Sequence, residues 1–201
     1  DNARPALQFD GIDDYVDVGN ASALNFEKSN PFTIECWVTV SSAQNGYGTI
    51  ISKFDATGDN KGWGLQLYNG VLRSFVGNNG EDQSAKVKGT TDLRDDLPHH
   101  IVWSYDGSTN GAGFSFWIDG QSESVIIYSD DLSTSLMSNI DPVEIGGNTG
   151  WGEYLLGDIS EVRIWNAVRT QSEIIDNMNM SLVGSEIGLV GYWKCDEADG
   201  S

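Results

Sequence analysis

The sequence has 201 residues and a formal net charge of −19, with 11 Lys plus Arg against 30 Asp plus Glu. This acidic balance argues against a nucleic-acid partner, because phosphate groups are bound by clustered Lys and Arg. No apolar run approaches the roughly 20 residues of a transmembrane helix, so we expect no membrane insertion. The length fits one all-β domain, which can bury enough surface to fold without a metal or a disulfide.

Alternation of apolar and polar residues dominates the chain and predicts many short strands. In the clearest case, residues 32–40, Phe32, Ile34 and Val38 share one parity and polar Thr33 lies between the first two. We predict strands near residues 6–10, 14–18, 32–40, 48–54, 63–69, 71–77, 84–88, 99–105, 113–119, 122–128, 142–146, 154–166 and 188–195. Hairpin dipeptides such as Asn69-Gly70 separate several of them. This pattern predicts a sandwich or a barrel.

One helix is predicted near the C-terminus. Thr170 and Glu173 form the ends of a capping box, in which each side chain satisfies a free backbone donor of the other residue. A helical stripe follows at Ile174, Ile175, Met178 and Leu182, and Gly184 ends it. We expect a short helix over one end of the sandwich.

Three stretches, taken in order, carry a family resemblance: residues 9–16, 32–38 and 157–166. Together they resemble laminin-G-like modules of the concanavalin-A-like superfamily, in its pentraxin-related bacterial branch, and residues 99–107 and 117–120 resemble the central hairpin of that family. The resemblance implies an all-β jelly roll of two curved antiparallel sheets with one short helix near the C-terminus. It also implies a secreted or cell-surface protein that often binds calcium.

The ends of the chain predict a longer parent protein. The sequence does not begin with Met and opens on no signal peptide. Its last segment, 188–197, resembles the strand that closes one such module and leads into the next. We therefore expect residues 1–201 to form a single laminin-G-like domain excised from a larger multidomain protein.

Two cysteines, Cys36 and Cys195, stand near opposite ends of the chain without a C-x-x-C motif. A zinc or redox motif is therefore unsupported, and the pair forms either one disulfide or two ordinary buried thiols. The family places the two strands near each other, so the resemblance favours the disulfide.

A calcium site is predicted from strand parity. Asp158 shares the phase of Val162 and Ile164, which places its side chain inward at the start of a strand, and Asp14 shares the phase of Val16. A buried carboxylate is costly unless it is paired or binds a metal. Oxygen ligands of this kind are those that Ca²⁺ takes.

The resemblance implies a calcium ion at this edge, with Asp10 and Asp158 as leading ligands. Asp14 is a further candidate, and Asn30 is a plausible additional oxygen donor. The alternative is that Asp10 and Asp14 only cap a tight turn, as Asp side chains often do. Such a calcium would be structural and would pin the N-terminal loop to the late strand.

Catalysis is not predicted. Glycosidases need two carboxylates flanking the scissile bond, but the nearest candidates are three residues apart, which places them on opposite faces of a regular strand: Asp158 with Glu161, and Asp141 with Glu144. The only two histidines are adjacent, at 99 and 100, and no nucleophile motif accompanies them. We expect one histidine to pack and the other to form hydrogen bonds at a strand start.

Two loops, 55–63 and 146–154, combine aromatic side chains with amides and carboxylates. Sugars are held by aromatic faces and by directional hydrogen bonds from polar side chains. The predicted ligand-binding residues are Trp151, Asn148, Tyr154, Trp63 and Asp59. Trp151 is the strongest candidate because it lies between two glycines, whereas Trp63 shares the parity of Leu65 and Leu67, which favours core packing.

Two functions follow from this pattern. The first is a non-catalytic, calcium-binding, carbohydrate-binding module of a secreted or cell-surface protein, with a glycan as partner. The second is a calcium-stabilised structural or adhesion module that binds an extracellular protein and no sugar. The fold accommodates both functions, so the choice rests on the binding residues.

Overall fold

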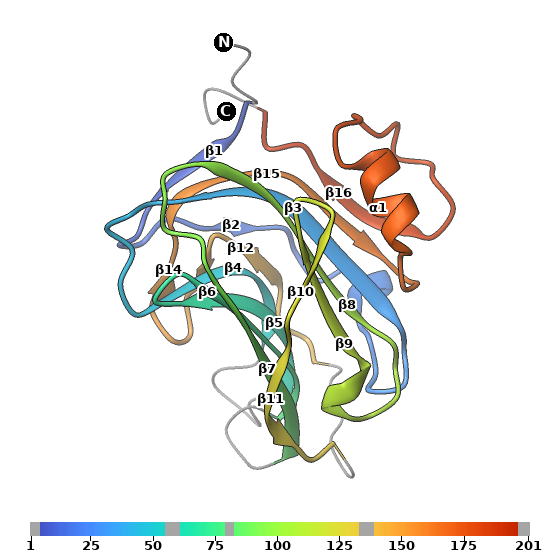
Figure 1. Ribbon diagram of the computed structural model, residues 1–201. Helices are drawn as coiled ribbons and strands as arrows, with labels where there is room; N and C mark the ends of the chain where they lie inside the picture. Colours follow the sequence, from blue (N-terminus) through green and yellow to red (C-terminus); the bar gives the residue numbers. More distant parts are fainter. Residues whose placement is uncertain (1–4, 55–60, 79–82, 133–138, 197–201) are drawn as a thin grey trace.

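The computed structural model of the chain describes residues 5–54, 61–78, 83–132 and 139–196. Within them, two seven-stranded antiparallel sheets pack face to face (Figure 1). The first sheet has the order β1 (Leu7–Asp10), β15 (Leu156–Trp165), β3 (Phe32–Val40), β8 (Pro98–Tyr105), β9 (Phe114–Ile118) and β10 (Gln121–Glu123), and β16 (Leu189–Trp193) also pairs with β15. The predicted jelly-roll sandwich is confirmed.

The second sheet has the order β11 (Ile126–Asp130), β7 (Gln83–Asp92), β6 (Val71–Asn78), β5 (Lys61–Tyr68), β4 (Tyr47–Phe54), β12 (Val143–Ile145) and β2 (Val16–Asp17). A separate small hairpin joins β13 (Gly147–Asn148) to β14 (Glu153–Tyr154). Short 3₁₀ helices span Ser22–Leu24 and Gly111–Gly113. Strand β3 has the bounds that alternation predicts, because an uninterrupted period of two is the strongest sequence signal of a strand.

The core lies between the two sheets and is rich in aromatic rings. Phe32 stacks on Phe26 with ring centroids 4.6 Å apart and meets Trp103 edge-on at 5.0 Å. Trp63 from the second sheet packs on Phe32 at 6.1 Å, so this cluster joins the two sheets. Each fully buried side chain of this size stabilises the fold by about 1.5–3 kcal/mol.

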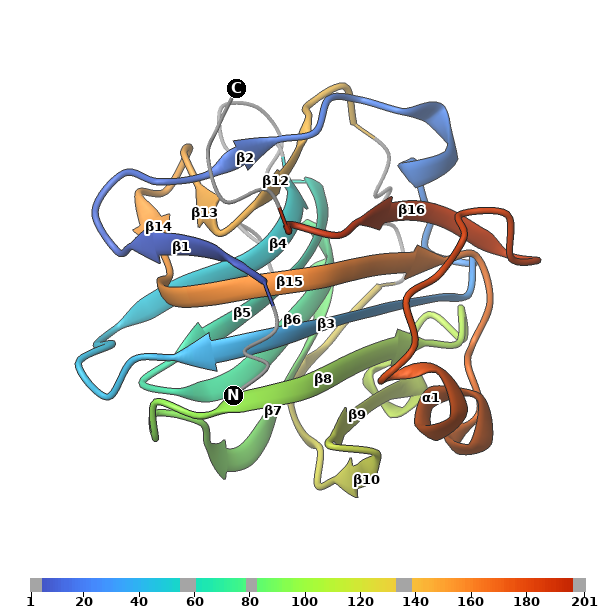
Figure 2. The same ribbon diagram turned by 90° about the horizontal axis from the view of Figure 1, so that it is seen from above.

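Helix α1 (Gln171–Asn177) begins with the predicted capping box, in which both reciprocal hydrogen bonds of Thr170 and Glu173 are present. The helix is shorter than its stripe predicts, since it ends at Asn177 rather than near Gly184. Arg163 of β15 donates to the Asn177 carbonyl at 3.0 Å, and the Trp37 ring of β3 donates to the next carbonyl along the chain. These contacts place α1 on the outer face of the first sheet (Figure 2), not over one end of the sandwich.

Strand β15 contains a β-bulge that decides where its side chains point. Its register with β3 shifts between Ser160 and Arg163, and Glu161 has a φ of 52°. One extra residue reverses the alternation, so residues on either side of a bulge with the same parity face opposite sides of the sheet. The inward residues are Ile159 before the bulge and Val162 after it.

Cys36, buried in β3, and Cys195, which follows β16, form no disulfide with each other in this structure. The structure therefore does not support the favoured disulfide. Strand β15 lies between β3 and β16, and two strand spacings separate their backbones by roughly 10 Å. A disulfide needs Cα atoms within about 7 Å of each other.

In the part of the chain that the structure covers, no helix is long and apolar enough to cross a bilayer.

Candidate functional site

The outer face of the second sheet carries polar and aromatic side chains from five neighbouring strands. Gln66 of β5 lies directly opposite Arg73 of β6, and Arg73 lies opposite Lys88 of β7. Phe75, two residues further along β6, lies opposite Lys86. These positions alternate with core residues, so their side chains point away from the first sheet.

A wall rises from this face where the β13–β14 hairpin packs on β4. Asn148 fixes the hairpin: its side-chain amide donates to Ser52 Oγ at 3.3 Å, and its Oδ1 accepts from the Trp151 backbone at 3.1 Å. The Trp151 ring then lies 4.1 Å from the Phe54 ring and 6.1 Å from the Phe75 ring, measured between centroids. Trp151 remains partly exposed at the hairpin tip.

Sheet and hairpin together enclose a depression of about 340 Å³, which we call the hairpin cavity. Its lining combines aromatic rings with groups able to form hydrogen bonds: Tyr47, Phe75, Tyr128, Trp151, Gln66, Arg73, Ser74, Lys86 and Glu153. Concave sites with aromatic walls and a few convergent polar groups are typical of small-molecule and sugar binding.

Glu153 is the acidic group of this cavity. The Gln66 side-chain amide donates to its Oε2 at 2.6 Å. Burial raises the pKa of Glu153 to about 7, although the Gln66 hydrogen bond acts in the opposite direction. The carboxyl group therefore changes its charge near neutral pH.

The structure brings only one of the predicted ligand-binding residues, Trp151, into this cavity. Asn148 is 1% exposed and holds the hairpin, and Trp63 is 1% exposed in the core, so neither side chain is accessible from the cavity. Tyr154 is not in the lining, because it follows Glu153 on a strand and points the other way, over Gly147. Asp59 lies outside the described residues.

Sequence reasoning missed the cavity residues on the sheet itself, among them Arg73, Gln66 and Tyr128. Each is an outward-facing residue of a strand, and a polar residue at such a position is typical of ordinary solvent-exposed surface. A comparison of these outward positions along the sheet would have found tyrosines and cations together, but it requires the order of the strands. The local sequence does not contain that order.

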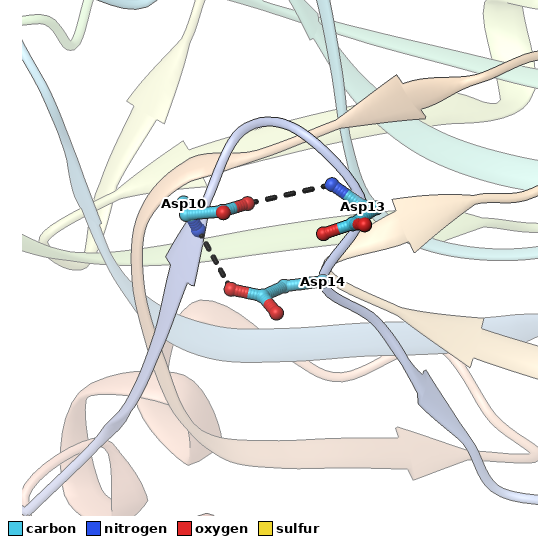
Figure 3. Close-up of side chains that lie close together, drawn as sticks. All are labelled: Asp10, Asp13 and Asp14. Carbon is cyan, nitrogen blue, oxygen red and sulfur yellow. Dashed lines mark hydrogen bonds between the residues drawn. The ribbon is translucent and has the colours of Figure 1, made fainter.

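A second candidate site is acidic and lies at the turn between β1 and β2. The carboxylate oxygens of Asp10, Asp13 and Asp14 lie within 4.8 Å of one another (Figure 3). Asp10 Oδ1 accepts from the Ile12 backbone at 2.8 Å, and Asp14 Oδ2 accepts from the Asp10 backbone at 3.0 Å. These hydrogen bonds form the capped tight turn that is the alternative to a metal site. Asp10 and Asp14 each use one carboxylate oxygen for the turn and have a second one.

Asp158 borders the same depression as Asp10 and Asp14, and Asp96 from the loop before β8 joins them. The depression has a volume of about 580 Å³, and no Lys or Arg among the described residues lines it. Burial raises the pKa of Asp158. The structure thus gathers three of the four predicted metal ligands at one place.

Two parts of the metal prediction are wrong. Asp158 does not face inward: it lies opposite Thr39, an outward position of β3, because the bulge reverses the phase between it and Val162. Asn30 precedes Phe32, the first residue of β3, and Phe32 lies roughly 23 Å along the strand from Thr39, the partner of Asp158. The Asn30 Oδ1 accepts from the Glu27 backbone.

The outer face of the first sheet carries buried charges, which we call the covered network. Glu35 is 1% exposed and lies 3.3 Å from His100 and 3.7 Å from Arg163. Burial acts to raise the pKa of Glu35, but the hydrogen bond and charge of His100 and the charge of Arg163 lower it overall. These groups lie beneath α1 and the segment that follows it, so no substrate reaches them in this structure.

The two predicted roles of the histidines are confirmed. His100 packs in the covered network, and His99, at the start of β8, lies 2.8 Å from Asp119. The face prediction for Asp158 and Glu161 is wrong, because the bulge turns both outward. Glu161 instead pairs with Arg163 at 2.7 Å and leaves no free carboxylate pair with Asp158.

Two facing antiparallel sheets, with a short C-terminal helix on one and a walled cavity on the other, define a lectin-like sandwich. The Laminin_G_3 family model, which describes the Concanavalin A-like lectin/glucanases superfamily, matches residues 10–175. The chain belongs to this family, and the resemblance drawn from the sequence is confirmed. No curated protein sequence matches the chain.

Three solved structures illustrate the fold. A candidate carbohydrate-binding protein of Bacteroides ovatus is 21% identical with a TM-score of 0.67, covering 98% of this chain and 54% of its own. The CBM40 module of the Ruminococcus gnavus IT-sialidase, bound to α2,3-sialyllactose, is 13% identical with a TM-score of 0.65. The match covers 86% of this chain and 95% of the CBM40 chain. A heptameric SAP-like pentraxin of Limulus polyphemus is 14% identical with a TM-score of 0.58 and covers 86% and 81%.

At these identities the likeness shows the fold alone. The chain spans about half (54%) of the length of the Bacteroides ovatus protein.

Proposed function

We propose that this chain is a non-catalytic carbohydrate-binding module and that the hairpin cavity is its glycan site. The observation that carries the proposal is the position of Trp151, which is held partly exposed over a cavity whose other walls offer hydrogen-bonding groups. Two of the structural relatives, the Bacteroides ovatus protein and the CBM40 module, are described as carbohydrate-binding, which supports the same proposal.

The chemistry of the cavity suits a sugar ring. An aromatic face takes up the apolar C–H side of a pyranose, while amide, carboxyl and guanidinium groups bond its hydroxyls. Here the Trp151 ring is backed by Phe54 and Phe75, so it is ordered before a ligand arrives. Ordering the binding groups in advance reduces the entropy lost on association.

A glycan array with purified protein tests this proposal. We expect wild-type protein to bind a set of glycans and Trp151→Ala to lose at least about tenfold in affinity, as is common for a central aromatic contact. Trp193→Ala, which removes a partly buried tryptophan from the opposite edge strand β16, is the matched control. Binding of a protein ligand with no glycan signal would instead favour the adhesion module.

We further propose that the acidic depression binds calcium and that the ion fixes the β1–β2 turn to β15. Asp10 and Asp14 of the turn line the depression together with Asp158 and Asp96, and Asp13 lies beside the first two. These carboxylates supply the hard oxygen donors that Ca²⁺ prefers. Bringing these negative charges together in a chain of net charge −19 is unfavourable without a cation. The ion would have a structural role, outside the glycan site.

Calorimetric titration of calcium into chelator-treated protein tests the metal proposal. We expect binding and a higher unfolding temperature with calcium, because a ligand of the native state alone stabilises it. Asp14→Asn, which keeps an acceptor oxygen for the turn, should weaken both effects, and Asp176→Asn on the exposed side of α1 should change neither. Equal calcium binding by Asp14→Asn and wild type would refute the site.

We propose a secreted or cell-surface location for the protein that contains this module. A strongly acidic surface suits surroundings rich in salt and calcium, where cations screen its self-repulsion. Protease accessibility on intact cells, with a cytoplasmic protein as the control, measures this directly.

A further inference from the structure

Three cationic side chains lie next to one another on one face of this acidic protein. Of the 11 Lys plus Arg in the sequence, Arg73, Lys86 and Lys88 lie side by side on β6 and β7, on the outer face of the second sheet. Arg73 and Lys88 also line a second cavity, of about 450 Å³, on the other side of Arg73 from the hairpin cavity. Among the described residues that line the two cavities, Glu153 is the one carboxyl group.

Tyrosines, not carboxylates, surround Arg73. Its guanidinium carbon lies 4.4 Å from the Tyr68 ring centroid, 5.3 Å from that of Tyr128 and 5.8 Å from that of Tyr47. It also donates to the Tyr47 hydroxyl at 3.3 Å. Within the described parts of the chain, no carboxylate lies within ion-pair distance of Arg73. The rings orient the guanidinium without neutralising its charge.

The pairing of Arg73 with Lys88 is itself unfavourable. Like charges directly opposite each other on neighbouring strands destabilise a sheet. The other buried or half-buried arginines of the structure show the usual solution, since Arg163 pairs with Glu161 and Arg169 with Glu173. An anionic ligand between Arg73 and its neighbours would supply the missing negative charge.

Resting on the proposed function, we propose that the glycan bound at the hairpin cavity is an anionic saccharide whose acidic group is held by Arg73. A planar guanidinium presents parallel N–H groups that match the oxygens of a carboxylate or a sulfate. The tyrosine rings flank this group and can face the adjoining sugar rings. The net charge of −19 does not oppose binding at short range, because salt screens charges beyond about 8–10 Å.

The same glycan array tests this inference if it contains neutral, carboxylated and sulfated members. We expect the bound glycans to be anionic, and their affinity to fall as the salt concentration rises. Arg73→Gln should weaken binding by about 10- to 100-fold, the range for losing hydrogen bonds to a charged group. Arg73→Lys keeps the charge but not the planar guanidinium, so its affinity should lie between those of wild type and Arg73→Gln. Lys194→Gln, an exposed lysine after β16, should bind like wild type.

The outcomes separate the two proposals. Binding of neutral glycans that Trp151→Ala abolishes and Arg73→Gln leaves unchanged would overturn the anionic inference but keep the glycan site. Absence of any glycan binding would overturn both. Preference for carboxylated over sulfated members, or the reverse, identifies which acid Arg73 holds. Circular dichroism and thermal unfolding of each variant show that a loss of binding is not a loss of fold.

Discussion

The two outer faces of the sandwich each carry an arginine, and the surroundings of these two side chains are opposite in kind. On the first sheet, Arg163 is completely buried, pairs with Glu161 and Glu35, and donates to backbone carbonyls at the end of α1 and just after it. On the second sheet, Arg73 is partly exposed among tyrosines, with no ion pair to a described carboxylate. The comparison shows that charges covered by a helix and its following segment pair with one another, whereas Arg73 on the open face pairs with no described carboxylate.

The physical reason is desolvation. A charge removed from water must be compensated by partners, and a buried pair that loses one partner leaves the other uncompensated. A partly exposed guanidinium keeps much of its hydration and needs no such partner. Stability should therefore depend on Arg163, and binding should depend on Arg73.

The largest expected effect comes from Arg163→Met, which leaves the buried Glu161 without its cation and leaves Glu35 with His100 alone. We expect a loss of about 3–5 kcal/mol in the free energy of unfolding, measured by urea denaturation. Arg73→Met is the matched substitution on the open face and should change stability by less than about 1 kcal/mol. Equal losses in the two variants would break the comparison.

A smaller effect is expected from the helix that covers the first face. Thr170→Ala removes the side-chain half of the capping box and should cost about 1 kcal/mol of stability. Thr170→Ser keeps the hydroxyl group and serves as the control, with thermal unfolding as the measurement. No difference between the two variants would mean that packing alone holds the helix in place.

The smallest effect concerns pH at the open face. Because burial raises the pKa of Glu153 to about 7, this carboxyl group takes up a proton as the pH falls from 8 to 6 and the cavity loses a negative charge. The affinity for an anionic glycan should therefore rise a few-fold as the pH falls from 8 to 6, a change in binding free energy of at most about 1 kcal/mol. Glu153→Gln should bind with an affinity independent of pH between 6 and 8. A wild-type affinity that falls with falling pH would contradict this role.

The same raised pKa has a consequence for stability, with the sign fixed by linkage. Between about pH 4.5 and 7 the folded chain keeps the Glu153 proton that the unfolded chain has lost, so the free energy of unfolding decreases as the pH rises through this window. Relative to wild type, Glu153→Gln should therefore become more stable above pH 7. Denaturation at pH 5 and pH 8 compares the two proteins.

Regular alternation made the sheets predictable, and a single irregularity defeated the prediction at Asp158. The period of two over residues 32–40 places every core side chain of β3 correctly. In β15 the positive φ of Glu161 falls on a residue that is not glycine, so nothing in its sequence marks the bulge. Parity counted across it then assigns Asp158 to the wrong face.

The binding face was predicted in part for a similar reason. Trp151 stood out locally because glycines flank it in a loop. Arg73, Gln66 and Tyr128 become neighbours only when β6, β5 and β11 take their places in one sheet. Strand order is set by pairing between segments far apart in the chain, which no local pattern records.

The sequence by itself determined the all-β class, nearly all of the strands, the helix cap and the family, because each rests on short-range periodicity or motif order. Tertiary structure alone decided that Asp158 faces outward and that Asn30 lies away from the depression that Asp10, Asp14 and Asp158 share. It also decided which arginine is buried and which faces solvent. Those outcomes depend on packing between distant segments, where register, bulges and the covering helix fix the surroundings of each charge.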